Sequence, residues 1–201
     1  MTISLFAPRE LRGLSPPIRA LVRAALAAEG LGAGEIAVML TGDADLRALN
    51  REWRCIDRAT DVLSFSYDET GPGETVRPAT RVPSRRPRPA GAGIPEGSPA
   101  PKRRGARPRT HGDLVIPLDR ARDQARRFRV SEGAELARLV IHGALHLAGL
   151  DHRRPVERRR MRVCEDAVLR SQRVSVRALE HVLRRDTGGA KTHAGAARRR
   201  G

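Results

Sequence analysis

The sequence predicts one α+β domain, in which about four strands form a mixed sheet with helices mainly on one side. Two observations support this class. Short apolar stretches with the alternation of half-buried strands occur at four places. Between and after them lie segments whose apolar residues recur every three or four positions, the pattern of amphipathic helices. With 201 residues, the chain is long enough for a single domain with a substantial core.

The first part of the chain is predicted to hold three strands and two helices. The strands are TISLF (2–6), EIAVMLT (35–41) and TDVLSFSYD (60–68). The helices are PPIRALVRAALAAEGLG (16–32) and DADLRALNREWR (43–54). The first helix ends at a glycine, a frequent C-terminal signal, and Asp43 is the expected N-cap of the second.

One further strand and three helices are predicted in the second part of the chain. The strand is GDLVIPL (112–118). The helices are DRARDQARRF (119–128), SEGAELARLVIHGALHLAG (131–149) and PVERRRMRVCEDAVLR (155–170). Ser131 occupies the expected N-cap position of the long helix. The helix at 155–170 is expected to be the last element of the fold.

Two segments have the composition of unstructured chain. Residues 70–111 hold nine of the 14 prolines and ten basic against two acidic side chains, a net charge of +8. Neither this segment nor residues 184–201 can bury enough apolar surface to offset the entropy of ordering. We therefore expect a disordered basic insertion at 70–111 within one domain spanning 1–183, followed by a disordered basic tail at 184–201.

The net charge of +16 favours a polyanionic partner, most simply nucleic acid. A general arginine bias is the alternative reading, because only two of the 39 basic residues are lysines. The chain has five aromatic residues, which leaves little scope for base stacking. Phosphate contacts are therefore expected to dominate any binding of nucleic acid.

The sequence also carries expectations about location. It shows no basic segment followed by an apolar run, so no secretory signal is expected. No stretch approaches the roughly 18 apolar residues of a membrane span. Cys55 and Cys164 are far apart and in no metal-ligand spacing, so we expect buried thiols in a reducing compartment. These observations predict a cytoplasmic protein that is not associated with a membrane.

Three of the six histidines lie in HGALHLAGLDH (142–152). His142 and His146 are four residues apart, so on a helix their side chains leave one face, one turn apart. Gly149 can end the helix and reverse the chain, which brings His152 back toward the same point. Three imidazoles with no fourth ligand are typical of a catalytic metal site, because structural zinc is usually closed by four protein ligands. The alternative, ordinary core histidines, explains this spacing poorly.

Gly143 bears on the kind of chemistry. The spacing of the histidines and Gly149 matches the zinc-protease pattern HExxHxxGxxH, but Gly143 stands where that pattern has its glutamate. The glutamate carries protons between water and the leaving amine, which a glycine cannot do. The ligand set therefore fits a hydrolase, whereas the protease mechanism does not fit. Gly143 is expected to admit a neighbouring strand or to leave room beside the metal.

The same segment resembles a known family. HGALHLAGLDH is similar to the HGxLHLxGYDH signature of the YbeY-type endoribonucleases, which are rRNA maturation factors. Three further segments agree with family motifs: LNREWRCIDRATDVLSF (49–65), GDLVI (112–116) and ELARLVIHG (135–143). The resemblance covers roughly 1–69 and 112–173. The departures touch none of the histidines; they are Trp53, Ala59, Ser66 and Leu150.

This resemblance implies that His142, His146 and His152 bind one Zn2+ and that the protein cleaves single-stranded RNA. It implies a role in maturing the 3′ end of small-subunit ribosomal RNA and in ribosome quality control, with the small subunit and its proteins as partners. The family's motif arginine falls on Arg54, which is expected to face the metal cleft. A planar guanidinium suits that place because it can grip two phosphoryl oxygens as negative charge develops.

Other polar residues near the motifs are given structural roles. Asp151 is expected to cap the turn or to orient an imidazole, and Asp61 and Asp113 are expected to be structural. The sequence thus predicts one metal-hydrolase domain. Two other functions stay open: a ribosome-assembly factor that holds zinc without catalysis, and a zinc peptidase that draws its carboxylate from elsewhere in the fold.

Overall fold

The structure is a computed structural model that describes residues 2–55, 57, 60–67 and 109–196. For Trp53, Arg54 and residues 186–196 it describes the backbone alone. Most of the predicted insertion, from residue 70 to residue 108, lies outside the described residues.

A four-stranded sheet in the order β1-β2-β4-β3 forms the base of the domain. Its strands are β1 (Thr2–Phe6), β2 (Gly32–Thr41), β3 (Leu63–Ser66) and β4 (Arg109–Pro117). β1 pairs in parallel with β2 and β2 with β4, whereas β3 runs antiparallel to β4. The mixed α+β sheet predicted from the sequence is confirmed.

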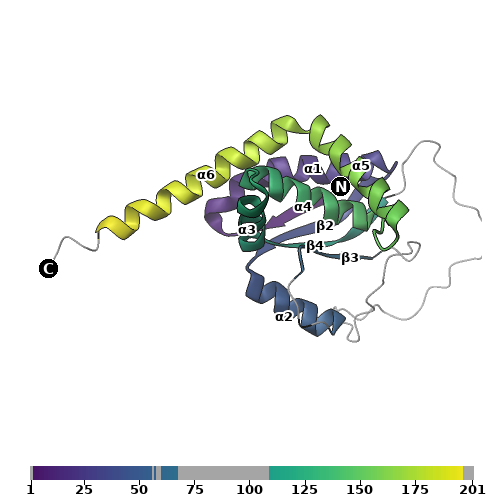
Figure 1. The fold of residues 1–201 in the computed structure, drawn as a ribbon, viewed down its shortest axis with the longest axis horizontal. Coiled ribbons are helices and arrows are strands. Elements are labelled where there is room, and N and C mark those ends of the chain that lie inside the picture. The colour runs from purple at the N-terminus through teal and green to yellow at the C-terminus, as the bar shows by residue number, and fades with distance from the viewer. Residues whose placement is uncertain (1, 56, 58–59, 68–108, 197–201) are drawn as a thin grey trace, which may run out of the picture.

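Helices cover both faces of the sheet unequally (Figure 1). They are α1 (Ser15–Ala28), α2 (Asp43–Arg54), α3 (Leu118–Phe128), α4 (Glu132–Leu147), α5 (Pro155–Ser171) and α6 (Arg173–Ala196), with a 3-10 helix, η1 (Arg9–Leu14), before α1. All the α-helices except α2 pack on one face around the main core, while α2 covers part of the other face through Leu46, which packs with Leu63 and Val115. The helices are therefore mainly on one side, as predicted.

Helix α4 lies at the centre of the core. Its buried side chains include Leu136, Leu139, Val140 and Ile141, each 0% exposed. The structure confirms its N-cap, since the Ser131 Oγ accepts a hydrogen bond from the backbone N–H of Ala134 at 3.1 Å. A helix so fully buried holds the residues at its C-terminal end in fixed positions.

Two local predictions were wrong in detail. Asp43 is the first residue of α2 rather than its cap; Gly42 occupies the cap position in the extended conformation and has no side chain with which to bond the first turn. At this position the Asp43 carboxylate still interacts favourably with the N-terminal end of the helix dipole. Cys55 is exposed rather than buried, since it follows α2 in the left-handed conformation with a φ of 56°.

The predicted ends of the fold also need correction. The helix at 155–170 is not the last element, because α6 follows it and continues to Ala196, so the prediction of an unstructured tail from Arg184 was wrong up to that residue. Leu179 and Leu183 are buried in the main core, and once packing has nucleated a helix each further residue is added at small cost.

The predicted insertion ends earlier than expected. Residues 109–111 belong to β4, where the Nδ1 of His111 accepts the N–H of Glu35 at 3.1 Å and its carbonyl accepts the N–H of Tyr67. Both ends of the segment outside the described residues are therefore neighbours across the β3–β4 ladder. None of the described helices is long and apolar enough to cross a membrane.

Candidate metal centre

The three histidines lie around the C-terminal end of α4. His142 and His146 are on the last two turns of the helix and are partly buried, whereas His152 follows the helix and is exposed. The helix ends in a Schellman motif: the N–H of Gly149 bonds to the carbonyl of His146 and the N–H of Leu150 to that of Leu145. Gly149 has a φ of 87°, which a residue with a side chain rarely adopts. This turn brings His152 back to the helix, as the sequence predicted.

The donor atoms of the three rings converge. One nitrogen from each of His142, His146 and His152 lies within 4.8 Å of the others. The Nε2 atoms of His142 and His146 are 3.2 Å apart. Two ligands that bind one tetrahedral ion at about 2.05 Å are separated by about 3.3 Å, so this pair is already spaced for a shared ion. Among the described residues, this is the group of at least three His, Cys, Asp or Glu side chains placed to hold a metal.

Glu165 supports the first of these rings from α5. Its Oε1 is 2.6 Å from the Nδ1 of His142, and the residue is only 8% exposed. A carboxylate in this position takes the hydrogen bond from Nδ1–H, which fixes the tautomer and leaves the Nε2 lone pair free for a metal. The sequence reasoning missed Glu165. Its one signal is an acidic residue on the apolar face of α5, between the buried residues Met161 and Val168.

The protonation state of the site suits a cation. Burial, together with the neighbouring His142 and His152, lowers the pKa of His146 to about 4. The ring is therefore neutral near pH 7 and keeps the lone pair that a metal ion needs. The donor set, its spacing and the carboxylate behind His142 together fit a divalent ion such as zinc.

Gly143 leaves room for the part of the sheet that packs against α4, as predicted from the sequence. A Cβ at this position would lie 3.0 Å from side-chain carbons of both Leu114, on β4, and Val62, just before β3. The residue that takes the place of the protease glutamate thus faces packed apolar side chains. A carboxylate here would point into the core instead of toward the three histidines.

Asp151 has the local role that was expected of it. Its Oδ1 accepts the backbone N–H of His152 at 2.6 Å, and its Oδ2 is 3.1 Å from the Nε of Arg153. Partial burial opposes ionisation, but these two donors and the neighbouring rings hold the pKa of Asp151 below its usual value. The residue therefore orders the turn that carries His152.

Asp61 and Asp113 both make structural contacts. Asp61 accepts hydrogen bonds from the Nε of Arg120 at 2.8 Å and the Nε2 of Gln124 at 2.9 Å, which tie the connection between α2 and β3 to α3. Asp113 on β4 accepts a hydrogen bond from the hydroxyl of Tyr67, and burial with this bond raises the pKa of the tyrosine to about 12.

Arg54, the predicted catalytic residue, is the last residue of α2. The structure fixes its backbone there and does not describe its side chain. The following connection runs past Asp57, which pairs with Arg47 of α2 at 2.7 Å, to Val62 beside Gly143. The same connection that begins after Arg54 therefore reaches the helix that carries the histidines.

The fold and this site define an α+β protein with a three-histidine centre of the kind that metal-dependent hydrolases use. The model of a family described as Endoribonuclease YbeY matches residues 12–173. Endoribonuclease YbeY of Anaeromyxobacter sp. (strain Fw109-5) is 40% identical over 163 residues, which are 80% of this chain and 67% of the relative. Endoribonuclease YbeY of Anaeromyxobacter dehalogenans (strain 2CP-C) is 36% identical over 172 residues, which are 86% of this chain and 72% of the relative.

The chain belongs to the YbeY family of endoribonucleases, and the resemblance drawn from its motifs is confirmed. Among solved structures, the solution structure of TM1509 from Thermotoga maritima is 21% identical, covers 86% of this chain and 93% of its own, and has a TM-score of 0.43.

Proposed function

We propose that this protein is a zinc-dependent endoribonuclease that cleaves single-stranded RNA. The observation that carries the proposal is the convergence of three imidazole donors, without a fourth ligand among the described residues, in a chain of an endoribonuclease family. Such a donor set leaves a coordination position for substrate or water, which is the arrangement of catalytic zinc sites. Membership of an endoribonuclease family also favours RNA over peptides as the class of substrate.

Each residue of the site has a defined part in this proposal. His142, His146 and His152 hold the ion, and Glu165 orients His142. When bound, zinc supplies a Lewis acid that polarises a phosphoryl oxygen and lowers the pKa of water. We assign Arg54 the task of gripping the phosphoryl oxygens on which negative charge develops.

We further propose that the RNA is the precursor of small-subunit ribosomal RNA and that it is cleaved near its 3′ end. The protein then acts on ribosomes in the cytoplasm, both in maturation and in quality control. With five aromatic residues in the whole chain, base stacking contributes little to choosing a sequence. Specificity then comes from the shape of the RNA or from docking on the small subunit and its proteins.

The proposal is tested by cleavage of a defined single-stranded RNA with substrate in large excess over the enzyme. We expect multiple turnovers, loss of activity after chelation, and recovery when zinc is returned. A duplex of the same sequence is the control and should be cleaved far more slowly. Turnover of a peptide substrate but not of RNA would favour a peptidase, and zinc binding without any turnover would favour a non-catalytic assembly factor.

A further inference from the structure

The arginines of α5 are not all in the same situation. Arg160 is tied to Glu29, the C-cap of α1, with its Nη2 2.6 Å from the carboxylate. Arg153, just before the helix, pairs with Asp151. Arg158 and Arg162, in contrast, are exposed, and no described acidic side chain pairs with either of them, Asp166 included.

Helical geometry places these two unpaired arginines on the side of α5 that faces the histidines. The direction of that side is set by Glu165, whose carboxylate contacts His142. Seven residues are two turns less about 20°, so Arg158 lies almost in line with Glu165, about 10 Å nearer the start of the helix. Arg162 lies three residues before Glu165, about 60° from it around the axis. Arg160 lies on the opposite side, toward α1.

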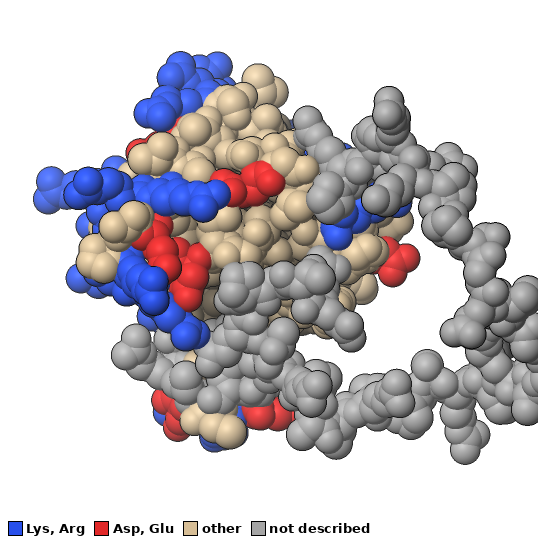
Figure 2. Space-filling model, turned by 90° about the vertical axis from the view of Figure 1, so that its right-hand side faces the viewer, with Lys and Arg blue, Asp and Glu red and all other residues tan. Residues whose placement is uncertain are grey.

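Arg159 and Arg170 of α5 are also exposed without a described acidic partner, but they lie about 120° and 140° around the axis from Glu165 and so face away from the histidines. On the side of α1 an acidic residue neutralises the arginine, which is what a structural ion pair requires. On the side of the histidines the positive charge is left for another partner. Figure 2 views the end of the molecule at which α4 ends and α5 begins, and it shows basic side chains at the left and top of this face, with acidic side chains among those at the left.

We propose that Arg158 and Arg162 form a phosphate-binding rim, which holds the backbone of single-stranded RNA beside the three histidines. This inference rests on the proposed function, because it assumes that RNA reaches the histidine centre. A guanidinium pairs with phosphate oxygens through two parallel hydrogen bonds. Two such residues about one turn apart on an exposed helix can contact successive or nearby phosphates without reading the bases.

The test is the salt dependence of RNA binding. The double variant Arg158→Gln/Arg162→Gln is compared with the wild-type protein, using anisotropy of a fluorescent oligouridylate over a series of salt concentrations. Each phosphate contact to a single strand contributes about 0.7 to the slope of log affinity against log salt, so the slope should become shallower by about 1.4. In cleavage assays KM should rise while kcat stays nearly constant, because these contacts hold ground state and transition state alike.

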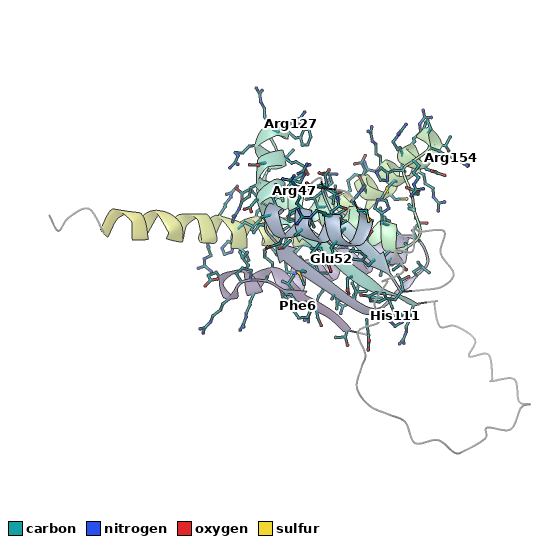
Figure 3. The ribbon with its side chains drawn as sticks, turned by 90° about the horizontal axis from the view of Figure 1, so that it is seen from below. Phe6, Arg47, Glu52, His111, Arg127 and Arg154 are labelled. Carbon is teal, nitrogen blue, oxygen red and sulfur yellow. The ribbon has the colours of Figure 1, made fainter. Side chains whose placement is uncertain are left out.

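The matched control removes the same charge from the other end of α4. Arg127 of α3 and Arg129, the C-cap of that helix, are exposed, lie close to the start of α4 and pair with no described acidic side chain. Arg126, in contrast, pairs with Asp123 and is left in place. Figure 3 shows Arg127 and Arg154, which adjoins α5, in well-separated parts of the molecule. Arg127→Gln/Arg129→Gln should leave the slope and KM unchanged, and Arg158→Lys/Arg162→Lys should keep most of the slope.

The outcomes separate the two proposals. If wild-type protein binds and cleaves RNA but Arg158→Gln/Arg162→Gln keeps the wild-type slope and KM, the rim is overturned and the proposed function stands. An equal effect of the α3 control also overturns the rim, since total charge would then explain the binding. If the wild-type protein neither binds nor cleaves RNA, the proposed function itself fails.

Discussion

Glu165 lies with its Oε1 2.6 Å from the Nδ1 of His142, so a carboxylate from α5 fixes the first imidazole of the site on α4. Acidic side chains are rarely buried in a protein interior unless they have a hydrogen-bond partner, and His142 is that partner for Glu165. Because the contact joins two helices, it couples the position of a metal ligand to the packing of the core.

Replacing Glu165 with glutamine should therefore weaken zinc binding. Glutamine has the same size but cannot supply the carboxylate that fixes the tautomer and raises the basicity of His142, and loss of such a partner typically costs about 10–100-fold in metal affinity. The affinity is measured by competition with a chromogenic chelator. Asp166→Asn, an exposed neighbour on the same helix, should leave it unchanged. Wild-type affinity in Glu165→Gln would show that the contact has no part in the site.

Gly143 should not accept a branched side chain. A Cβ there already meets Leu114 and Val62 at 3.0 Å, and further methyl groups would force both away. We expect Gly143→Val to lower the free energy of unfolding by about 1–3 kcal/mol, the usual cost of overpacking, as measured by urea denaturation. Gly143→Ala, which adds the single carbon, should cost less. Full stability in the valine variant would contradict the close packing of this helix against β4.

The segment from residue 70 to residue 107 should be dispensable for folding. Its two ends leave neighbouring strands, with the N–H of Tyr67 bonded to the carbonyl of His111, so a short glycine-serine link can join them. Long loops also close at an entropic cost that grows slowly with length. We expect a melting temperature within a few degrees of wild type, checked by circular dichroism. Collapse of the fold would contradict this.

The same deletion should weaken RNA binding and flatten its salt dependence, because it removes nine basic and two acidic residues. The comparison uses the anisotropy assay with oligouridylate. An affinity and slope equal to those of wild type would show that the charge of this segment is incidental to RNA.

Arg54 is predicted to act on the reaction and not on the fold. Arg54→Ala should lower RNA cleavage by about 100-fold or more, the effect of removing one preorganised donor from a transition state. Zinc content and melting temperature should hardly change. Arg54→Lys keeps the charge but loses the two-pronged grip, so it should restore activity only in part. If activity falls only together with zinc or stability, the arginine braces the domain.

The sequence predicted most accurately what depends on nearby residues. The Ser131 cap, the four-residue spacing of His142 and His146, and the turn at Gly149 are local signals, and the structure has all three. Gly143 could also be interpreted, because a glycine in a helix otherwise costs about 1 kcal/mol relative to alanine and so suggests a close neighbour.

Features that depend on distant residues escaped prediction. Glu165 is 23 residues from His142, and nothing in the spacing of α5 says which partner satisfies its carboxylate. Helix α6 was not predicted, because residues 184–201 have the composition of unstructured chain; the burial of Leu179 and Leu183 in the core instead nucleates a helix that continues through Gly188 and Gly189. His111 was assigned to the insertion on composition, whereas in the structure it belongs to β4 and its carbonyl accepts the N–H of Tyr67.

The most direct test of the central claim is a titration of metal-free protein with zinc, in which bound zinc and RNA cleavage are followed in the same samples. The account predicts that cleavage rises in proportion to bound zinc and reaches its plateau at about one zinc per chain, as three ligands with an open position imply. The parallel titration of His146→Ala should show little bound zinc and little cleavage. Cleavage by the metal-free protein, or full zinc occupancy in His146→Ala, would contradict the three-histidine centre as the site of the reaction.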